Sequence, residues 1–520
     1  MTAIGENRRR QVVPRWRPWL DTVKLGQVAM PGKRLTIHRE PVIERLLLEY
    51  KTTGHIGLAS EIVSAALVDS VDSSEVESIA RELASTASYP LMRQMAELLL
   101  DVDFGGLADP AHYDGRIRIS KLKGILADEP RNSVRWVDLA REYLIMAQYQ
   151  QSQSAMRIAL ALAPHNRFVV RSASAMYAQL QEFDLAIDVI RSSPSYRHDP
   201  WLLAALVAIS DLSDSRQLGM REARRTMEAD ISQAQLSELR AAVGTVEFRS
   251  GSSRKGRQLL RRSTKDGSEN SLAQVEWIAH DSREVLLDHL PTGVPRAYEA
   301  LARRASSSAN WERAIQHAMD WTWDQQFATE PRSFSSSCAC AWENWSLAVE
   351  LAEGGLVLHP DQPVLLNNRA FALIQLGDLR GALIDLVRAR SVDAHSRSKI
   401  VLAATEACLF YRAGMPATGR RRYQQVIAVL NRRQERILAA KAALMLSREE
   451  YFAGSYGFQA AWHRAEELMK YADVPEIRDL YNRIEESIGS RSPSPHGSHS
   501  VVDLAPLVPE PEALAPGIGR

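Results

Sequence analysis

Residues that could carry out covalent or metal chemistry occur in the sequence, but their spacing does not assemble a site. Cys338 and Cys340 are two positions apart, so on a helix they point to different sides, and no second cysteine pair or nearby histidine completes a metal-binding set. The serines at 335–337 have no histidine and carboxylate spaced as in a catalytic triad. The sequence also lacks a phosphate-binding glycine loop, a His-Glu-x-x-His motif and a Gly-x-Ser-x-Gly motif. We therefore expect no catalytic residues, no metal and no cofactor, and an enzyme only if distant groups converge in the fold.

Basic residues form clusters that could bind anions. Two clusters lie in the body of the chain: Arg254, Lys255, Arg257, Arg261 and Arg262, and Arg420, Arg421, Arg422, Arg432, Arg433 and Arg436. Together with a basic N-terminus they could form a track for nucleic acid, and the competing interpretation is a solvated outer surface. The whole chain has 64 basic and 63 acidic residues, a net charge of +1, which argues against a general attraction to nucleic acid or anionic membranes.

Length and composition favour a large soluble protein. At 520 residues the chain exceeds one compact core, so we expect several domains or one extended repeat array. Only three cysteines are present, an odd number that fits a reducing compartment. No stretch approaches the about 20 apolar residues that span a bilayer. No apolar signal-peptide core follows the arginines at 8–10. We expect a cytoplasmic protein that makes no membrane contact.

The chain divides by composition into an arm, a helical body and a tail. Residues 1–39 are basic and interrupted by prolines, and we interpret them as an extended arm with Trp16, Trp19 and Leu25 as anchors, or alternatively as a cap on the first helices. Residues 488–520 are rich in proline, serine and glycine and are expected to be disordered. Between them apolar residues recur with helical spacing. We divide this body into two helical arrays, 40–294 and 295–487.

Within the body, a repeat of 34 residues is visible. Windows 295–328, 329–362 and 363–396 fall into register, and eight of the nine residues at positions 8, 20 and 27 are small. Position 8 holds Ala302, Ser336 and Ala370, position 20 holds Ala314, Ala348 and Ala382, and position 27 holds Trp321, Gly355 and Ala389. Two antiparallel helices can cross closely only where small side chains lie at the crossing. The turn between the helices is predicted at Gly377-Asp378.

This pattern resembles the tetratricopeptide repeat family. Window 133–166 matches the family pattern best, with one departure at position 20, where Ser152 replaces the usual alanine; its matching residues are Trp136, Leu139, Ala140, Tyr143, Met156, Ala159 and Pro164. Further units are assigned at 40–73, 167–193, 237–270 and 400–433. The resemblance implies an all-α fold, a right-handed α-solenoid of antiparallel helix pairs that forms a superhelix with a concave groove.

In this family the first helix of each pair lines the concave groove. Transferring those positions to this sequence gives a set of candidate partner-binding residues in which arginine recurs: Arg141, Arg171, Phe248, Arg249, Arg296, Arg303, Asn367, Phe371, Tyr411 and Arg412. Arginine binds carboxylates and phosphates with a planar donor fork, so the groove could accept an acidic segment. Glutamates such as Glu238 and Glu299 lie at similar positions and could neutralise these arginines, which would leave a mixed, solvated face.

The resemblance implies a function in binding rather than catalysis. We expect a non-catalytic scaffold, adaptor or regulator that binds another protein through an extended or helical segment in the groove. A nucleic-acid-associated regulator that uses the arm and the arginine clusters, and a non-catalytic subunit of an enzyme complex, are the alternatives. The repeat serves many unrelated tasks, so the sequence predicts the fold far better than it predicts the partner.

Overall fold

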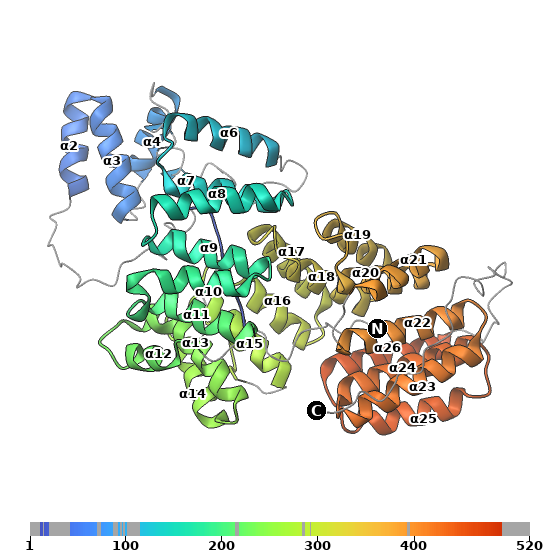
Figure 1. Ribbon diagram of the computed structural model, residues 1–520. Coiled ribbons are helices and arrows are strands. Elements are labelled where there is room, and N and C mark those ends of the chain that lie inside the picture. Colours follow the sequence, from blue (N-terminus) through green and yellow to red (C-terminus); the bar gives the residue numbers. More distant parts are fainter. Residues whose placement is uncertain are drawn as a thin grey trace. The chain divides into compact units, whose positions relative to one another are not determined.

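The computed structural model describes residues 11–13, 15–19, 42–69, 74–86, 92–93, 96, 99–100, 115–213, 218–282, 286–291, 293–392 and 396–490. In this part of the chain all regular structure is helical, which confirms the predicted all-α class (Figure 1). The anchor predicted at Leu25 falls outside the described residues. So does the tail predicted for 488–520, except for residues 488–490, which form the end of the last helix.

Two compact units make up the chain. The small unit comprises residues 29–117, and the large unit comprises 1–28 together with 118–520. The described residues of the N-terminal arm, 11–13 and 15–19, therefore belong to the same unit as most of the repeats. The further division of the helical body that we predict at 294/295 stays a prediction.

The small unit contains three described helices, α2 (Val42–Thr53), α3 (Ile56–Asp69) and α4 (Ser74–Thr86). The first two form the helix pair predicted for 40–73, with Gly54 in the turn between them at φ +59°. The backbone of a residue with a side chain rarely adopts that left-handed conformation, whereas glycine does so without strain. Ala59, Val63 and Ala66 are buried in the core that the three helices share.

The large unit is a succession of helices joined mostly by short turns. They are α6 (Gly115–Asp128), α7 (Ser133–Ile145), α8 (Tyr149–Leu162), α9 (Arg167–Gln179), α10 (Phe183–Ser192), the 3₁₀ helix η2 (Pro194–Arg197), α11 (Pro200–Leu212), α12 (Met220–Met227), α13 (Gln233–Arg249), α14 (Ser253–Ser263), α15 (Glu269–Ser282), α16 (Tyr298–Ser307), α17 (Trp311–Asp324), α18 (Glu330–Ala341), α19 (Trp345–Leu356), α20 (Pro363–Leu376), α21 (Leu379–Ser391), α22 (Ser396–Arg412), α23 (Pro416–Arg432), α24 (Arg436–Phe452), α25 (Phe458–Met469) and α26 (Pro475–Ser490). Neighbouring helices pack as antiparallel pairs, and each pair packs on the next, as in a tetratricopeptide-like solenoid. None of the helices in the described residues is both long and apolar enough to cross a membrane.

Small residues lie where the helices of a pair cross, as the repeat predicts. The residues at positions 8 and 20 of the three tandem windows are completely buried. The contact is very close between α13 and α14, where a Cβ atom added to Gly256 would lie 2.5 Å from the backbone nitrogen of Phe248. Only glycine therefore fits at this crossing, and the distance between the two helix axes depends on it.

Ser152, the departure from the family pattern, fits for a different reason. It lies at the crossing of α7 and α8 with no exposed surface, and its hydroxyl donates a hydrogen bond of 2.7 Å to the carbonyl of Ala140 on the facing helix. A buried hydroxyl is tolerated when it is hydrogen-bonded, and the oxygen is small enough for close packing.

The close crossing can be tested by pairing two glycine substitutions. Gly256→Ala should lower the free energy of unfolding by about 1–3 kcal/mol, since the new methyl group collides with backbone rather than with a movable side-chain tip. Gly354→Ala, in the last turn of α19 with nothing within 4 Å of an added Cβ, should be neutral or stabilising by up to about 0.5–1 kcal/mol because alanine is the better helix former. Urea unfolding followed by circular dichroism measures both, and equal effects would contradict this account of the crossing.

Candidate functional site

The large unit binds part of its own N-terminus along one row of its helices. Residues 11–13 and 15–19, hereafter the arm segment, lie along the first helices of successive pairs and touch α7, α11, α13, α15, α16 and the turn after α17. In Figure 1 the segment is the dark blue thread that runs between α7 and α15. We call the face that it covers the groove. Gln11, Trp16 and Arg17 are each no more than 2% exposed, so these three side chains are buried as deeply as core residues.

The backbone of the arm segment is recognised by side chains rather than by another strand. The amides of Val12 and Arg15 donate to Gln274 Oε1 at 2.6 Å and Asn270 Oδ1 at 3.3 Å, both on α15. Backbone amides that are buried need such partners, and an extended chain cannot supply them from within itself. Recognition continues toward the end of the segment, where the amide of Trp19 donates to Asp138 Oδ1 on α7 at 3.1 Å.

Arg17 is the most strongly held side chain of the arm segment. Its Nε and Nη2 donate to the two carboxylate oxygens of Asp324, each at 2.7 Å, and its Nη1 donates to Glu269 at 2.6 Å. Burial lowers the pKa of this guanidinium, but the two carboxylates outweigh burial and raise the pKa overall. Burial likewise raises the pKa of Asp324, and Arg17 more than compensates, so that the pKa is lowered. Arg17 and Asp324 are therefore both charged in the folded protein.

The neighbours of Arg17 dock into aromatic surroundings. Trp16 packs beside Phe327 with ring centroids 5.5 Å apart, and Trp19 lies edge-on to Phe168 at 4.9 Å. Arg15 forms an ion pair with Glu299 and lies 5.5 Å from the ring centroid of Trp321. Trp16 and Trp19 were expected to anchor the arm, and both do so here.

Among the ten predicted groove residues, Arg141 contacts the arm segment directly. It lies on α7, and its Nε donates to the carbonyl of Trp16 at 3.3 Å while its Nη2 donates to the carbonyl of Asp324 at 3.3 Å. The guanidinium also lies 5.7 Å from the ring centroid of Phe327. This arginine thus clamps the arm segment against the turn that follows α17.

Four other predicted arginines pair with acidic or polar groups that lie along the arm segment. Arg303 and Arg296 bind Glu299 at 2.8 Å and Asp324 at 3.6 Å, the two acids that hold the arginines of the arm. Arg171 pairs with Glu238, which also accepts a hydrogen bond of 3.0 Å from Asn270. Arg249 lies 3.7 Å from Asp211, and Asp211 accepts a hydrogen bond of 3.2 Å from Gln11 of the arm segment. These arginines are paired with acidic residues of the same chain, which is the alternative that the sequence analysis gave for Glu238 and Glu299.

The remaining five predicted residues do not contact the arm segment. Phe248 lies under the guanidinium of Arg257 at 5.5 Å. The other four belong to α20 and α22, in the second half of the large unit. Asn367 accepts from Thr405 at 2.8 Å, Phe371 packs edge-on against Trp345 at 5.7 Å, Tyr411 donates to Glu450, and Arg412 pairs with Glu449 at 2.8 Å. Sequence reasoning missed the residues that recognise the arm backbone, because single glutamine and asparagine side chains carry no distinctive spacing.

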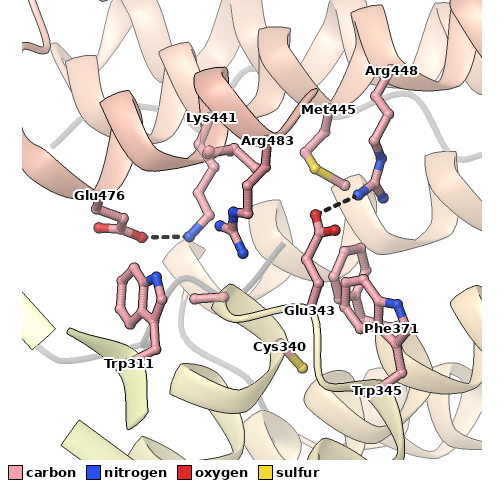
Figure 2. Close-up of a pocket in the computed structure, with 12 residues that line it drawn as sticks. Trp311, Cys340, Glu343, Trp345, Phe371, Lys441, Met445, Arg448, Glu476 and Arg483 are labelled. Carbon is pink, nitrogen blue, oxygen red and sulfur yellow. Dashed lines mark hydrogen bonds and ion pairs between the residues drawn. The ribbon is translucent and has the colours of Figure 1, made fainter. Parts of the chain in front are cut away.

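A separate pocket opens in the second half of the large unit, between α17–α20 and α24–α26. Figure 2 shows an aromatic floor that includes Trp311 and Trp345, with Lys441, Arg448 and Arg483 reaching into the pocket. Its charges are paired internally: Lys441 binds Glu476 at 2.5 Å, Arg448 binds Glu343 at 3.1 Å, and Arg483 binds Asp479 at 2.8 Å. Trp311 also donates to Asp479 at 2.9 Å, which links α17 to α26 across the pocket.

The predicted basic clusters lie on second helices and beside the turns of their pairs, and part of their charge is used internally. On α14, Lys255 pairs with Glu247 at 3.1 Å, while Arg254 and Arg262 are exposed. On α23, Arg422 is buried against Glu406 and Arg420 pairs with Glu450. Whether the exposed members contact nucleic acid stays a prediction.

The three cysteines are buried and form no disulfide bond. Burial raises the pKa of Cys338 and Cys340 to about 12 and that of Cys408 to about 11, so the thiols are protonated at neutral pH. Partial burial lowers the pKa of His359, whose Nε2 contacts the carbonyl of Phe327 at 3.1 Å. In the part of the chain that the structure describes, no cluster of three potential metal ligands occurs.

Comparison with known proteins yields only distant similarities. No family model matches the chain, and no curated protein matches it in sequence. Among solved structures, the Cut9–Hcn1 hetero-tetramer of the APC/C is similar over 85% of this chain and 92% of that one, at 10% identity and a TM-score of 0.33. A monomeric IFIT1 mutant with m7Gppp-AAAA is similar over 82% and 94%, at 12% identity and a TM-score of 0.31, and a Naa15–Naa10 complex bound to HypK over 86% and 81%, at 12% identity and a TM-score of 0.21.

The helices of the chain itself are more informative than these distant similarities. Its antiparallel pairs follow one another in tandem, with small buried residues at the predicted crossings. The chain is a tetratricopeptide-like repeat protein. Within this repeat protein, the arm segment covers a face to which α7, α13 and α15 contribute.

Removing the charge of Arg17 should release the arm segment. In Arg17→Gln the carboxylates of Asp324 and Glu269 lose a buried cation, a change that costs about 3–5 kcal/mol. We expect hydrogen–deuterium exchange of the amides of residues 12–19 to rise at least about 100-fold, with helix content unchanged. The matched control is Arg313→Gln, which alters an exposed arginine on α17 and should leave the exchange as it is. Unchanged protection in Arg17→Gln would show that the ion pairs do not hold the segment.

Asp138 should make the stability of the large unit depend on pH. Burial raises its pKa to about 6, and the Trp19 amide and Arg135 offset only part of this rise. Since the pKa in the unfolded chain is about 3.9, the folded state loses stability from this group as pH rises from about 4 through 6. Asp138→Asn keeps an acceptor for the Trp19 amide and removes the charge. It should stabilise the protein by about 1–3 kcal/mol at pH 8 and by nothing measurable at pH 4.

Urea unfolding at the two pH values measures this difference. The control is Asp128→Asn, at the exposed end of α6, which should change stability by less than about 0.5 kcal/mol at either pH. A gain for Asp138→Asn that is equal at pH 4 and pH 8 would rule out titration of this carboxyl as its source.

Proposed function

We propose that this chain is a non-catalytic scaffold or adaptor that binds a partner protein along the concave groove of its large unit. The observation that supports the proposal is that the groove already binds an extended polypeptide, the arm segment, through side chains of the first helices. Extended segments are commonly recognised in this way, with contacts to the backbone that give affinity and side-chain pockets that give specificity.

The groove offers both kinds of contact. Amide and carboxylate oxygens on α7 and α15 accept hydrogen bonds from backbone amides, and Arg141 donates one to a backbone carbonyl. Phe327 and Phe168 form aromatic contacts with the two tryptophans of the arm segment, which lie on either side of Arg17 in the sequence. Its buried charged groups are engaged in ion pairs, an arrangement suited to recognition rather than to proton transfer.

Photo-cross-linking in the native cell tests where a partner binds. A photoreactive amino acid would replace Arg135 or Arg296, partly exposed residues that border the groove through Asp138 and Asp324. Matched control positions are Arg157 on α8 and Arg313 on α17, exposed residues of second helices. We expect protein adducts from the groove positions and few from the controls, because the partner would follow the first helices.

Two results would contradict this proposal. Adducts that form only at the outward control positions would place the partner on the other face of the helix pairs. Adducts that consist of nucleic acid and disappear after nuclease treatment would support the alternative drawn from the basic clusters.

A further inference from the structure

We propose that the arm segment is an internal ligand that holds the place of a partner segment of the same chemistry: an extended stretch with two arginines two residues apart and aromatic residues beside them. The inference rests on the proposed function, since it names the kind of partner that the same groove accepts and how access to it is controlled. In the arm segment these features are Arg15, Trp16, Arg17 and Trp19.

The charge of the groove determines the charge of its occupant. Asp324, Glu269 and Glu299 are each at most 4% exposed at their side chains, and they bind Arg17 and Arg15. An occupant that brought no cation to the position of Arg17 would leave two carboxylates buried without the three hydrogen bonds that they now receive, a costly arrangement. A segment that replaces the arm must therefore be basic at this point. This differs from the acidic partner that the groove arginines suggested, because those arginines are already paired with acids.

The aromatic contacts select by shape. Trp16 is 1% exposed and packs beside Phe327, yet among the described residues its indole nitrogen has no hydrogen-bond partner. A phenylalanine in the same place would keep the apolar contact and would lose no hydrogen bond. The groove therefore requires an aromatic ring next to the arginine rather than tryptophan specifically.

The arm segment is attached in a way that allows replacement. It contributes no strand to a sheet and almost no helix, and it is held by side-chain hydrogen bonds and ion pairs that any segment of matching sequence could form. Because it is part of the same chain, it competes with an effective concentration that can reach the millimolar range. A free partner segment is thus excluded until the arm is released or outcompeted.

The test uses the full chain with a specific protease site inserted between Gly32 and Lys33. After cleavage, a fluorescein-labelled synthetic peptide of residues 11–19 should bind saturably in fluorescence anisotropy, and the uncut protein should bind it at least about tenfold more weakly. The peptide with Arg17→Glu should not bind detectably, whereas the peptide with Trp16→Phe should bind within about threefold of the original. These comparisons vary the peptide and leave the folding of the protein unchanged.

A charge exchange supplies a second readout. The cleaved protein with Asp324→Arg should lose the original peptide and gain binding of the Arg17→Glu peptide, because the ion pair is re-formed with its charges reversed. Circular dichroism before and after cleavage shows whether the helices persist. An oligomer that grows with protein concentration before cleavage would show that the arm is exchanged between copies of this chain, and it would overturn the proposal of a distinct partner.

Other outcomes would also overturn the inference. If the N-terminal fragment stays bound through gel filtration and the peptide never exchanges, or if cleavage unfolds the helices, the arm is a permanent part of the core. Failure of the peptide to bind while cross-links at Arg135 and Arg296 persist would reject this inference and leave the proposed function standing. Peptide binding without any cross-link in the groove would reject the proposed function and the partner named here, and would leave the arm as a ligand of its own chain only.

Discussion

The ion pairs that Arg17 makes with Asp324 and Glu269 are the constraint on which the groove depends. A repeat protein normally keeps charged residues of its concave face in water, where pairing contributes little. Here the arm segment removes that water, so each acid along the groove must have a cation or hydrogen-bond donor from the chain itself. The predicted arginines and the arginines of the arm share this role. Charge, more than shape, therefore decides what can lie in the groove.

Much of the fold could be predicted because close helix crossings leave a periodic trace in the sequence. Ala302, Ala314 and Gly355 are small for a geometric reason that any reader of the sequence can apply. Ser152 shows the limit of the rule, since a hydrogen bond across the crossing, invisible in the pattern, replaces the methyl group of alanine. Turns were harder to predict. Left-handed turn positions held by Ala147 and Gln181 carry no glycine to mark them, and the neighbouring helices impose the conformation.

The site was predicted only in part, because its contacts join residues that lie far apart in the sequence. The position of Arg141 within its repeat placed it on the concave face, where it now clamps the arm. That the arm would lie there depended on pairings between residues more than two hundred positions apart, such as Val12 with Gln274. No local pattern reports such a pairing. The sequence did contain one signal for this pairing: a basic N-terminus together with acidic residues at groove positions. The groove arginines, considered without those acids, indicated an acidic occupant instead of a basic one.

The path of the arm segment also has a mechanical consequence. In a repeat array each unit contacts only its neighbours, so stability is nearly additive along the array and unfolding can begin at either end. The arm segment instead joins Asp138 on α7 to Gln274 on α15 and Glu299 on α16, helices that are several repeats apart. It acts as a chord across the arc of helices. Contacts of this kind couple distant repeats into one cooperative unit, and they constrain how far the helix pairs can move relative to one another.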